Sequence, residues 1–125
     1  MMNIHESAED YLEAIMMLRE EKGYVRSVDI AARLSVTKPS VSFAMKKLRE
    51  NGYIHMDEEN LITLTDSGEE IAQRIFDRHR TITSFLVSLG VDPTIAREDA
   101  CKMEHDLSED SYEAMRRQLE KTEQE

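Results

Sequence analysis

Three residues near the end of the chain carry side chains that can bind a metal, and their spacing could bring them together. Cys101, Glu104 and His105 stand at positions i, i+3 and i+4, the spacing of one face of an α-helix. A thiolate, a carboxylate and an imidazole together suit a divalent transition metal. The alternative is a buried structural cysteine beside a solvated acidic face. The spacing alone leaves both interpretations open.

Any further ligands would have to come from other helices. Asp10 and Glu13 stand three positions apart in the first predicted helix, and their carboxylates form a pair of hard oxygen donors. His79 lies midway along a long predicted helix. Two carboxylates could equally form a solvated face, and the histidine could be an ordinary surface or core residue. The residue types by themselves do not choose between these interpretations.

The elements that must position these residues are mostly helices. Apolar residues recur at helical spacing in six segments, and two short strand-like runs are joined by the polar link Asp57–Asn60. Ser27, Thr37 and Ser108 are predicted N-caps. The predicted helices span residues 4–22, 28–34, 38–50, 66–89, 93–106 and 109 onward, fraying over 121–125, and the strands span 53–56 and 61–64.

Two short helices followed by a hairpin are the element order of a winged helix-turn-helix, which predicts DNA binding. The second of these helices, starting at Thr37, would present hydroxyls and cations to bases and phosphates. The alternative is a capped, solvated surface helix. The candidate DNA-contacting residues are Arg26, Thr37, Lys38, Pro39, Ser40, Ser42, Phe43, Lys46 and Lys47.

The charge distribution supports that prediction in spite of a net charge of −10. Between Lys22 and Gly52 the chain has seven basic and two acidic residues. A cationic segment of this kind can face phosphates even within an acidic protein. The acidic remainder would have to be oriented away from DNA or be partly neutralised by bound cations.

Length and composition fit one domain, or a small domain with an extension. We expect a mainly α protein with a winged helix-turn-helix over residues 1–65 and a helical region over 66–125. Long helices with a small core suggest that some apolar surface is buried between subunits. With one cysteine, no membrane-length apolar run and no signal peptide, the expected location is the cytoplasm.

Several motifs together resemble a known family. The stretches are Ser7–Glu13, Lys38–Ser42, Lys47-Leu48, Asn51–Tyr53, Arg78–Arg80 and Glu98–Ser108. They resemble the diphtheria toxin repressor family of metal-dependent bacterial regulators, and within it the manganese transport regulators. The resemblance implies a homodimer with an N-terminal winged helix and a helical dimerisation and metal-binding region. It also implies double-stranded DNA with a palindromic operator as the partner.

The resemblance further implies a ligand set: Asp10, Glu13, His79, Cys101, Glu104 and His105. This set is a hybrid, because the manganese regulators usually have Glu at the position of Cys101, and the iron regulators have Met at that of Asp10. A second site of the iron regulators uses His and Glu where this chain has Arg97 and Thr83, so the resemblance does not extend to it. The expected metal is Mn²⁺ or Fe²⁺, and Zn²⁺ or Co²⁺ could bind in vitro.

These observations predict a metal-dependent transcriptional repressor that controls metal-ion homeostasis. One alternative is a winged-helix transcription factor that senses a non-metal ligand, with Asp10, Cys101 and Glu104 serving a structural role. A second alternative is a metalloenzyme, since Cys, His and Glu around an open position could activate water. The sequence shows no nucleophile–base pair and no phosphate-cradling glycine loop, so no enzymatic activity is expected.

Overall fold

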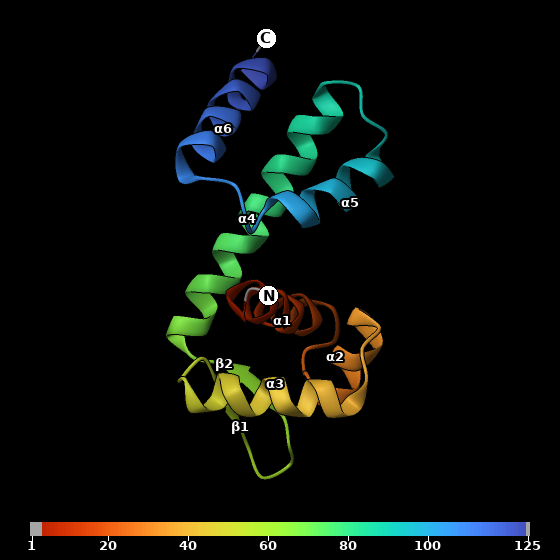
Figure 1. The fold of residues 1–125 in the computed structure, drawn as a ribbon, viewed down its shortest axis with the longest axis vertical. Helices are drawn as coiled ribbons and strands as arrows, with labels where there is room; N and C mark the ends of the chain where they lie inside the picture. Colours follow the sequence, from red (N-terminus) through yellow and green to blue (C-terminus); the bar gives the residue numbers. More distant parts are fainter. Residues whose placement is uncertain (1–3, 125) are drawn as a thin grey trace. The chain divides into compact units, whose positions relative to one another are not determined.

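The computed structural model describes residues 4–124 and confirms a mainly α fold with a small hairpin (Figure 1). In chain order the elements are α1 (Ile4–Lys22), α2 (Ser27–Leu34), α3 (Lys38–Glu50), β1 (Ile54–Met56), β2 (Ile62–Leu64), α4 (Asp66–Ser88), α5 (Pro93–Met103) and α6 (Glu109–Gln124). The order of α2, α3 and the hairpin is the predicted winged helix-turn-helix.

The chain forms two compact units that meet within α4, between Gln73 and Arg74. The first unit holds the winged helix together with α1 and the start of α4, and the second holds the rest of α4 with α5 and α6. None of the helices within residues 4–124 has the length and apolar character needed to cross a membrane.

The core of the first unit is built from the apolar faces of its helices and hairpin. Helix α1 contacts α2, α3 and β2, and a backbone hydrogen bond from Ile62 to the Val25 carbonyl (2.9 Å) connects the hairpin to the link between α1 and α2. Burying these faces is the main favourable contribution to the stability of such a unit. The fully buried side chains include Leu12, Ile15, Ile30, Val41, Met45 and Ile54.

Caps define where the recognition helix and its partner begin. Thr37 is the N-cap of α3, as predicted, and its hydroxyl oxygen accepts a hydrogen bond from the Ser40 backbone N–H. The prediction for α2 is wrong by one residue, because Arg26 and not Ser27 is the N-cap. The reason is that the Asp29 carboxylate reaches back to accept from the Arg26 N–H at 2.9 Å, which includes Ser27 in the first helical turn.

The hairpin is shorter than predicted by one residue at the start of each strand. Ile54 pairs with Leu64 in an antiparallel register, while the Tyr53 carbonyl accepts a hydrogen bond from the Thr65 N–H just beyond the ladder. The connecting loop is closed by the Asp57 carboxylate, which accepts hydrogen bonds from the Glu59 and Leu61 N–H groups. This arrangement fixes an acidic loop at the tip of the hairpin.

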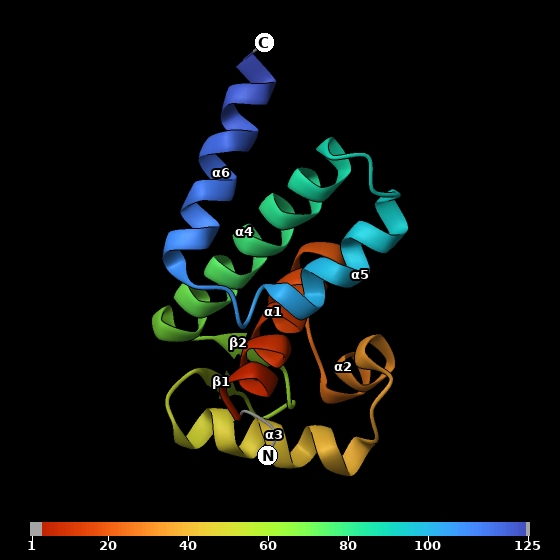
Figure 2. The same cartoon turned by 45° about the horizontal axis from the view of Figure 1, so that its top comes forward.

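In the second unit, α6 lies beside α4 (Figure 2), and the Tyr112 ring contacts the Arg78 guanidinium. Helix α5 ends at Met103, which corrects the predicted end at residue 106. A continuing helix would satisfy the Glu104 carbonyl with a later backbone N–H, but this carbonyl accepts from Arg78. Helix α6 continues to Gln124, so the fraying predicted over residues 121–125 is not observed up to that residue.

Candidate metal centre and nucleic-acid interface

The second unit brings three metal-binding side chains together from two helices. His79 comes from α4, Cys101 from the last turn of α5, and Glu104 from the C-cap position of α5. Their ligand atoms all lie within 4.8 Å of one another. His79 Nδ1 is 3.0 Å from Glu104 Oε2 and 3.8 Å from Cys101 Sγ. The fold thus gathers an imidazole, a thiol and a carboxylate into one cluster.

The donors in this cluster fit a divalent transition metal. Metal bonds to nitrogen, oxygen and sulfur are about 2.0–2.3 Å long, so neighbouring ligands of one ion lie roughly 3–4 Å apart. The distances from His79 Nδ1 to Glu104 Oε2 (3.0 Å) and to Cys101 Sγ (3.8 Å) both fall in that range. Glu104 is only 1% exposed, whereas Cys101 is exposed. An ion could therefore be held by a buried carboxylate and reached from the side of the thiol.

The same contacts change the acidity of His79. Hydrogen bonding to the Cys101 sulfur, and then to the Glu104 carboxylate, raises the pKa of the His79 imidazole from 6.5 to about 10. Both partners favour the protonated ring, and partial burial opposes them only in part. At neutral pH the proton on His79 occupies a place that a metal would take, so metal binding must displace it.

The remaining predicted ligands have different positions. His105 follows α5 and its Nε2 is 3.5 Å from Glu104 Oε1, the oxygen that does not contact His79. The side chains of Asp10 and Glu13 are half-buried on α1, in the first compact unit. The expectation that Cys101, Glu104 and His105 share one helical face is wrong, because α5 ends at Met103; Glu104 is its C-cap and His105 lies in the turn that follows.

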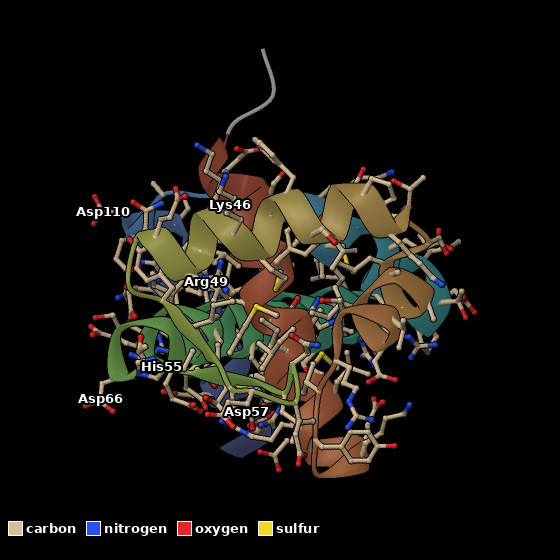
Figure 3. All side chains as sticks on the ribbon, turned by 90° about the horizontal axis from the view of Figure 1, so that it is seen from below. Lys46, Arg49, His55, Asp57, Asp66 and Asp110 are labelled. Atoms are coloured by element: carbon tan, nitrogen blue, oxygen red, sulfur yellow. The ribbon has the colours of Figure 1, made fainter. Side chains whose placement is uncertain are left out.

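The predicted DNA-contacting residues are all exposed. In Figure 3 the labelled side chains of Lys46 and Arg49 project from α3, while Asp57 lies on the hairpin loop. Phe43 is 65% exposed, and Lys47 Nζ lies 5.6 Å from the centre of its ring. The helix therefore presents cations and an uncovered aromatic ring on one element. The nine predicted DNA-contacting residues, all of them exposed, are Arg26, Thr37, Lys38, Pro39, Ser40, Ser42, Phe43, Lys46 and Lys47.

Two residues that were not predicted as site residues lie beside the two candidate sites, Tyr24 next to the DNA-contacting residues and Arg78 next to the metal-binding cluster. Tyr24 is 49% exposed and lies between Lys22 and Arg26, each 5.8 Å from its ring centre. The aromatic-cation sequence from residue 22 to 26 was the available signal for it. Arg78 is buried beside the metal-binding cluster. Its position next to His79 in the sequence gives no sign of that burial.

Comparison with known proteins assigns two successive stretches of the chain to one family. Residues 3–60 match the family model described as the iron dependent repressor, N-terminal DNA binding domain. Residues 65–125 match the iron dependent repressor, metal binding and dimerisation domain. The chain belongs to the iron-dependent repressor family. The family predicted from the sequence motifs is thereby confirmed, and the chain is a metal-dependent, DNA-binding transcriptional regulator.

Individual members of the iron-dependent repressor family show how far the likeness extends. The transcriptional regulator MntR of Escherichia coli O6:H1 is 44% identical over 111 residues, which is 89% of this chain and 72% of that protein. An uncharacterized HTH-type transcriptional regulator, MJ0568 of Methanocaldococcus jannaschii, is 39% identical over 118 residues, 93% of this chain and 94% of that one. These relatives are transcriptional regulators, so the metalloenzyme alternative is set aside.

Solved structures in the family share the fold. The manganese regulator SloR superposes with a TM-score of 0.80 at 31% identity, covering 90% of this chain. This chain spans about half, 53%, of the length of that structure. The likeness therefore concerns the DNA-binding and metal-binding regions that the two chains have in common.

Proposed function

We propose that this protein is a metal-responsive transcriptional repressor that controls metal-ion homeostasis, with Mn²⁺ or Fe²⁺ as its signal. The observation that carries the proposal is the cluster of His79, Cys101 and Glu104, whose ligand atoms lie within 4.8 Å of one another. In a chain with a DNA-binding domain, such a cluster gives a binding event through which metal concentration can act on DNA affinity.

The ligand set proposed here is the one that the family resemblance implies. His79, Cys101 and Glu104 form the cluster, and Asp10, Glu13 and His105 are proposed as additional ligands. Carboxylate-rich sites suit Mn²⁺, while a thiolate favours Fe²⁺, Co²⁺ or Zn²⁺ over it. A site with both donor types should therefore bind several of these metals in vitro, and supply in the cell would decide which of them is the signal.

The protein's own residues supply the response. His79 must release its proton to become a ligand. Glu104 is buried, and its carboxylate faces the His79 imidazole. A bound divalent cation would supply positive charge that offsets the carboxylates of the proposed ligands. It would also connect the helices that carry those ligands. A ligand shifts an equilibrium only by its differential affinity for the states involved. We propose that the arrangement that fits the operator is the one in which the ligands can converge.

We propose that α3 reads a palindromic operator in double-stranded DNA. Its start offers the Thr37, Ser40 and Ser42 hydroxyls, while Lys46 and Lys47 can contact phosphates. Phosphate contacts from the hairpin loop are not proposed, because residues Asp57, Glu58 and Glu59 make that loop acidic. Arg26 at the N-cap of α2 would add a cation on the neighbouring helix.

We propose that two copies meet through the apolar residues at the junction of α4 and α5. Val87, Leu89 and Ile95 are 40%, 66% and 51% exposed, which is unusual for large apolar side chains grouped within nine residues. A dimer would place two recognition helices on the two halves of a palindrome. Sedimentation velocity should show a dimer for the wild type and a shift toward monomer for Leu89→Glu.

Two further features belong to the same proposal. We propose that the functional division lies at residues 65 and 66, with the winged helix-turn-helix before it and the metal-binding and dimerisation region after it. The residues of α1 proposed as ligands are the exception to that division. We also propose that the protein acts in the cytoplasm, where a single thiol stays reduced and available to metal.

The test is DNA binding with and without metal under anaerobic conditions. Duplexes are selected from a random library by Mn²⁺-loaded and by chelator-treated protein, and the affinities of both forms for the selected duplexes are then compared. We expect Mn²⁺ or Fe²⁺ to tighten binding at least tenfold for the wild type, and to have no effect on Glu104→Gln. Glu98→Gln, an exposed carboxylate on the same helix, is the control. Equal affinity with and without metal would reject metal control.

The same experiment separates the alternative in which a non-metal ligand is sensed. In that case Cys101→Ala combined with His105→Ala should leave regulated DNA binding unchanged. Under the present proposal the double variant binds DNA with the affinity of the metal-free wild type, whatever metal is added. The two results exclude one another, so one pair of titrations decides between them.

A further inference from the structure

Arg78 is a buried cation beside the metal-binding cluster that the proposed mechanism does not use. It lies on α4, directly before His79, and is 8% exposed. Placing a guanidinium in a poorly solvated position is unfavourable unless its donors are satisfied. Within the described residues, Nη1 and Nη2 have acceptors whereas the buried Nε has none. The acceptors of Nη1 and Nη2 show which parts of the structure this residue holds together.

Two of those partners are backbone carbonyls around the turn after α5. Arg78 Nη1 donates to the Glu104 carbonyl at 3.0 Å and to the Leu107 carbonyl at 2.8 Å. These carbonyls follow the end of α5, where a helix leaves its last acceptors without intrahelical donors. One guanidinium nitrogen thus fastens both ends of the four-residue turn to α4.

The other two partners belong to α6. Arg78 Nη2 donates to Glu109 Oε2 at 2.7 Å, and the guanidinium carbon lies 5.1 Å from the centre of the Tyr112 ring. Arg78 therefore contacts the turn after α5 and the first residues of α6 at once. A lysine could not reproduce these contacts, because its single ammonium lacks the planar set of donors.

The bond to Glu104 connects this network to the metal-binding cluster. The Glu104 carbonyl is held by Arg78, while the carboxylate of the same residue contacts His79. Since Arg78 and His79 are adjacent in one helix, the main chain and the side chain of Glu104 are both fixed to the same turn of α4. Groups that hydrogen-bond to the ligands of a metal orient those ligands, and losing such a group typically lowers metal affinity about 10- to 100-fold.

We propose that Arg78 is a positioning residue of the metal centre: it fixes the Glu104 backbone and the turn to α6 so that the Glu104 carboxylate stays within reach of His79. This inference rests on the proposed function, since it concerns the same ligands. Arg78 does not bind the metal itself. Its effect is transmitted through the main chain of Glu104.

The test compares Arg78→Met and Arg78→Lys with the wild type, and uses Arg80→Met as the control. Arg80 is the same residue type on the other side of His79, and it is exposed. The readouts are Co²⁺ and Mn²⁺ affinity at low temperature, where the variants are folded, and the absorption bands of the Co²⁺ form. Thermal melting of the metal-free proteins measures the purely structural effect separately.

We expect Arg78→Met to lower metal affinity about 10- to 100-fold and to alter the Co²⁺ bands, since a displaced carboxylate changes the geometry at the metal. Arg78→Lys should fall between Met and wild type, and Arg80→Met should match the wild type. The inference would be overturned if Arg78→Met bound metal with the affinity of the wild type and gave the same Co²⁺ absorption bands, even with a lower melting temperature. If Arg78→Met does not fold, Arg78→Lys serves instead: metal binding by that variant with the affinity of the wild type would also overturn the inference.

The outcome also separates this inference from the proposed function. Failure of the wild type to bind Co²⁺ or Mn²⁺ would overturn the metal centre and this role for Arg78 with it. Metal binding by the wild type that is unaffected by every Arg78 variant would overturn only the positioning role. Tight metal binding by the wild type with weakened binding by the Arg78 variants supports both.

Discussion

His79 Nδ1 lies 3.0 Å from Glu104 Oε2, although 25 residues separate the two in the chain. This contact joins the middle of α4 to the end of α5, and Cys101 Sγ is 3.8 Å from the same imidazole nitrogen. A histidine held between a thiol and a buried carboxylate has two consequences that experiments can measure. Under the proposed ligand set, its proton opposes metal binding, and the thiol side chain affects which metal binds.

Replacing Cys101, the proposed sulfur ligand, should change metal preference more than total affinity. Cys101→Glu substitutes a hard carboxylate for a soft thiolate, so we expect the ratio of Mn²⁺ to Zn²⁺ affinity to rise by about tenfold or more. Competition titrations with a metal indicator measure both affinities on the same sample. Cys101→Ala is the control, since it removes the thiolate without adding a carboxylate. An unchanged ratio in Cys101→Glu would show that Cys101 is not a ligand.

Metal affinity should rise with pH. Hydrogen bonds to Cys101 and Glu104 raise the pKa of His79 to about 10, so the imidazole is protonated at pH 6–8 and must lose that proton on binding. We expect the apparent Mn²⁺ affinity to rise at least about tenfold per pH unit over that range. Calorimetry in buffers of different ionisation enthalpy counts the released protons. His79→Gln should bind weakly and release fewer protons, and equal proton release would contradict the assignment.

The metal-free protein should lose stability at alkaline pH for the same reason. The folded state binds the His79 proton more tightly than the unfolded state, whose histidine has a pKa near 6.5. The resulting stabilisation is fully present below about pH 6.5 and is lost as the pH rises through about 10. Urea unfolding of chelator-treated protein across this range measures it. The difference in stability between the wild type and His79→Gln should shrink as the pH rises, and a constant difference would be inconsistent with it.

Lys46 should contribute to DNA affinity without contributing to sequence preference. Its ammonium is exposed on α3 (Figure 3). Removing a lysine–phosphate contact weakens DNA binding about equally for all sequences. We expect Lys46→Gln to lower affinity for every duplex and to reduce the slope of log affinity against log salt by roughly one. Lys102→Gln, an equal charge change in the second unit, should leave the slope unchanged. The same loss of slope in both variants would indicate a general charge effect.

Gly68 should not tolerate a side chain, even though it lies within a helix. A Cβ built at this position collides with the Tyr53 carbonyl oxygen, which accepts the hydrogen bond from Thr65 that ends the hairpin. Alanine normally favours a helix over glycine, but here we expect Gly68→Ala to destabilise the protein by roughly 1–3 kcal/mol. Denaturant unfolding measures the change, with the exposed Ser67→Ala as the control. A more stable Gly68→Ala variant would mean that the hairpin can move away at little cost.

The sequence by itself determined the features that depend on neighbours a few residues apart. The N-cap at Thr37 could be predicted because a hydroxyl three residues before Ser40 can accept its N–H within one helical turn. Cys101 and Glu104 could be paired because they are three positions apart, at the end of α5 and at its C-cap. A local interaction also explains the error for α2, where the Asp29 carboxylate accepts from the Arg26 N–H and the helix begins one residue earlier than the predicted cap at Ser27 allows.

Only the tertiary structure decided which distant groups meet. His79 could be matched with Cys101 and Glu104 by family resemblance, but periodicity along α4 carries no information on which α5 side chains approach it. The burial of Arg78 and its bonds to the Glu104 and Leu107 carbonyls depend on how α4, α5 and α6 pack. Every residue has a backbone carbonyl, so a hydrogen bond to one does not depend on the residue type of the acceptor. The sequence therefore does not indicate which carbonyls Arg78 contacts. Local propensity sets the helices, whereas packing of their apolar faces sets the distances between them.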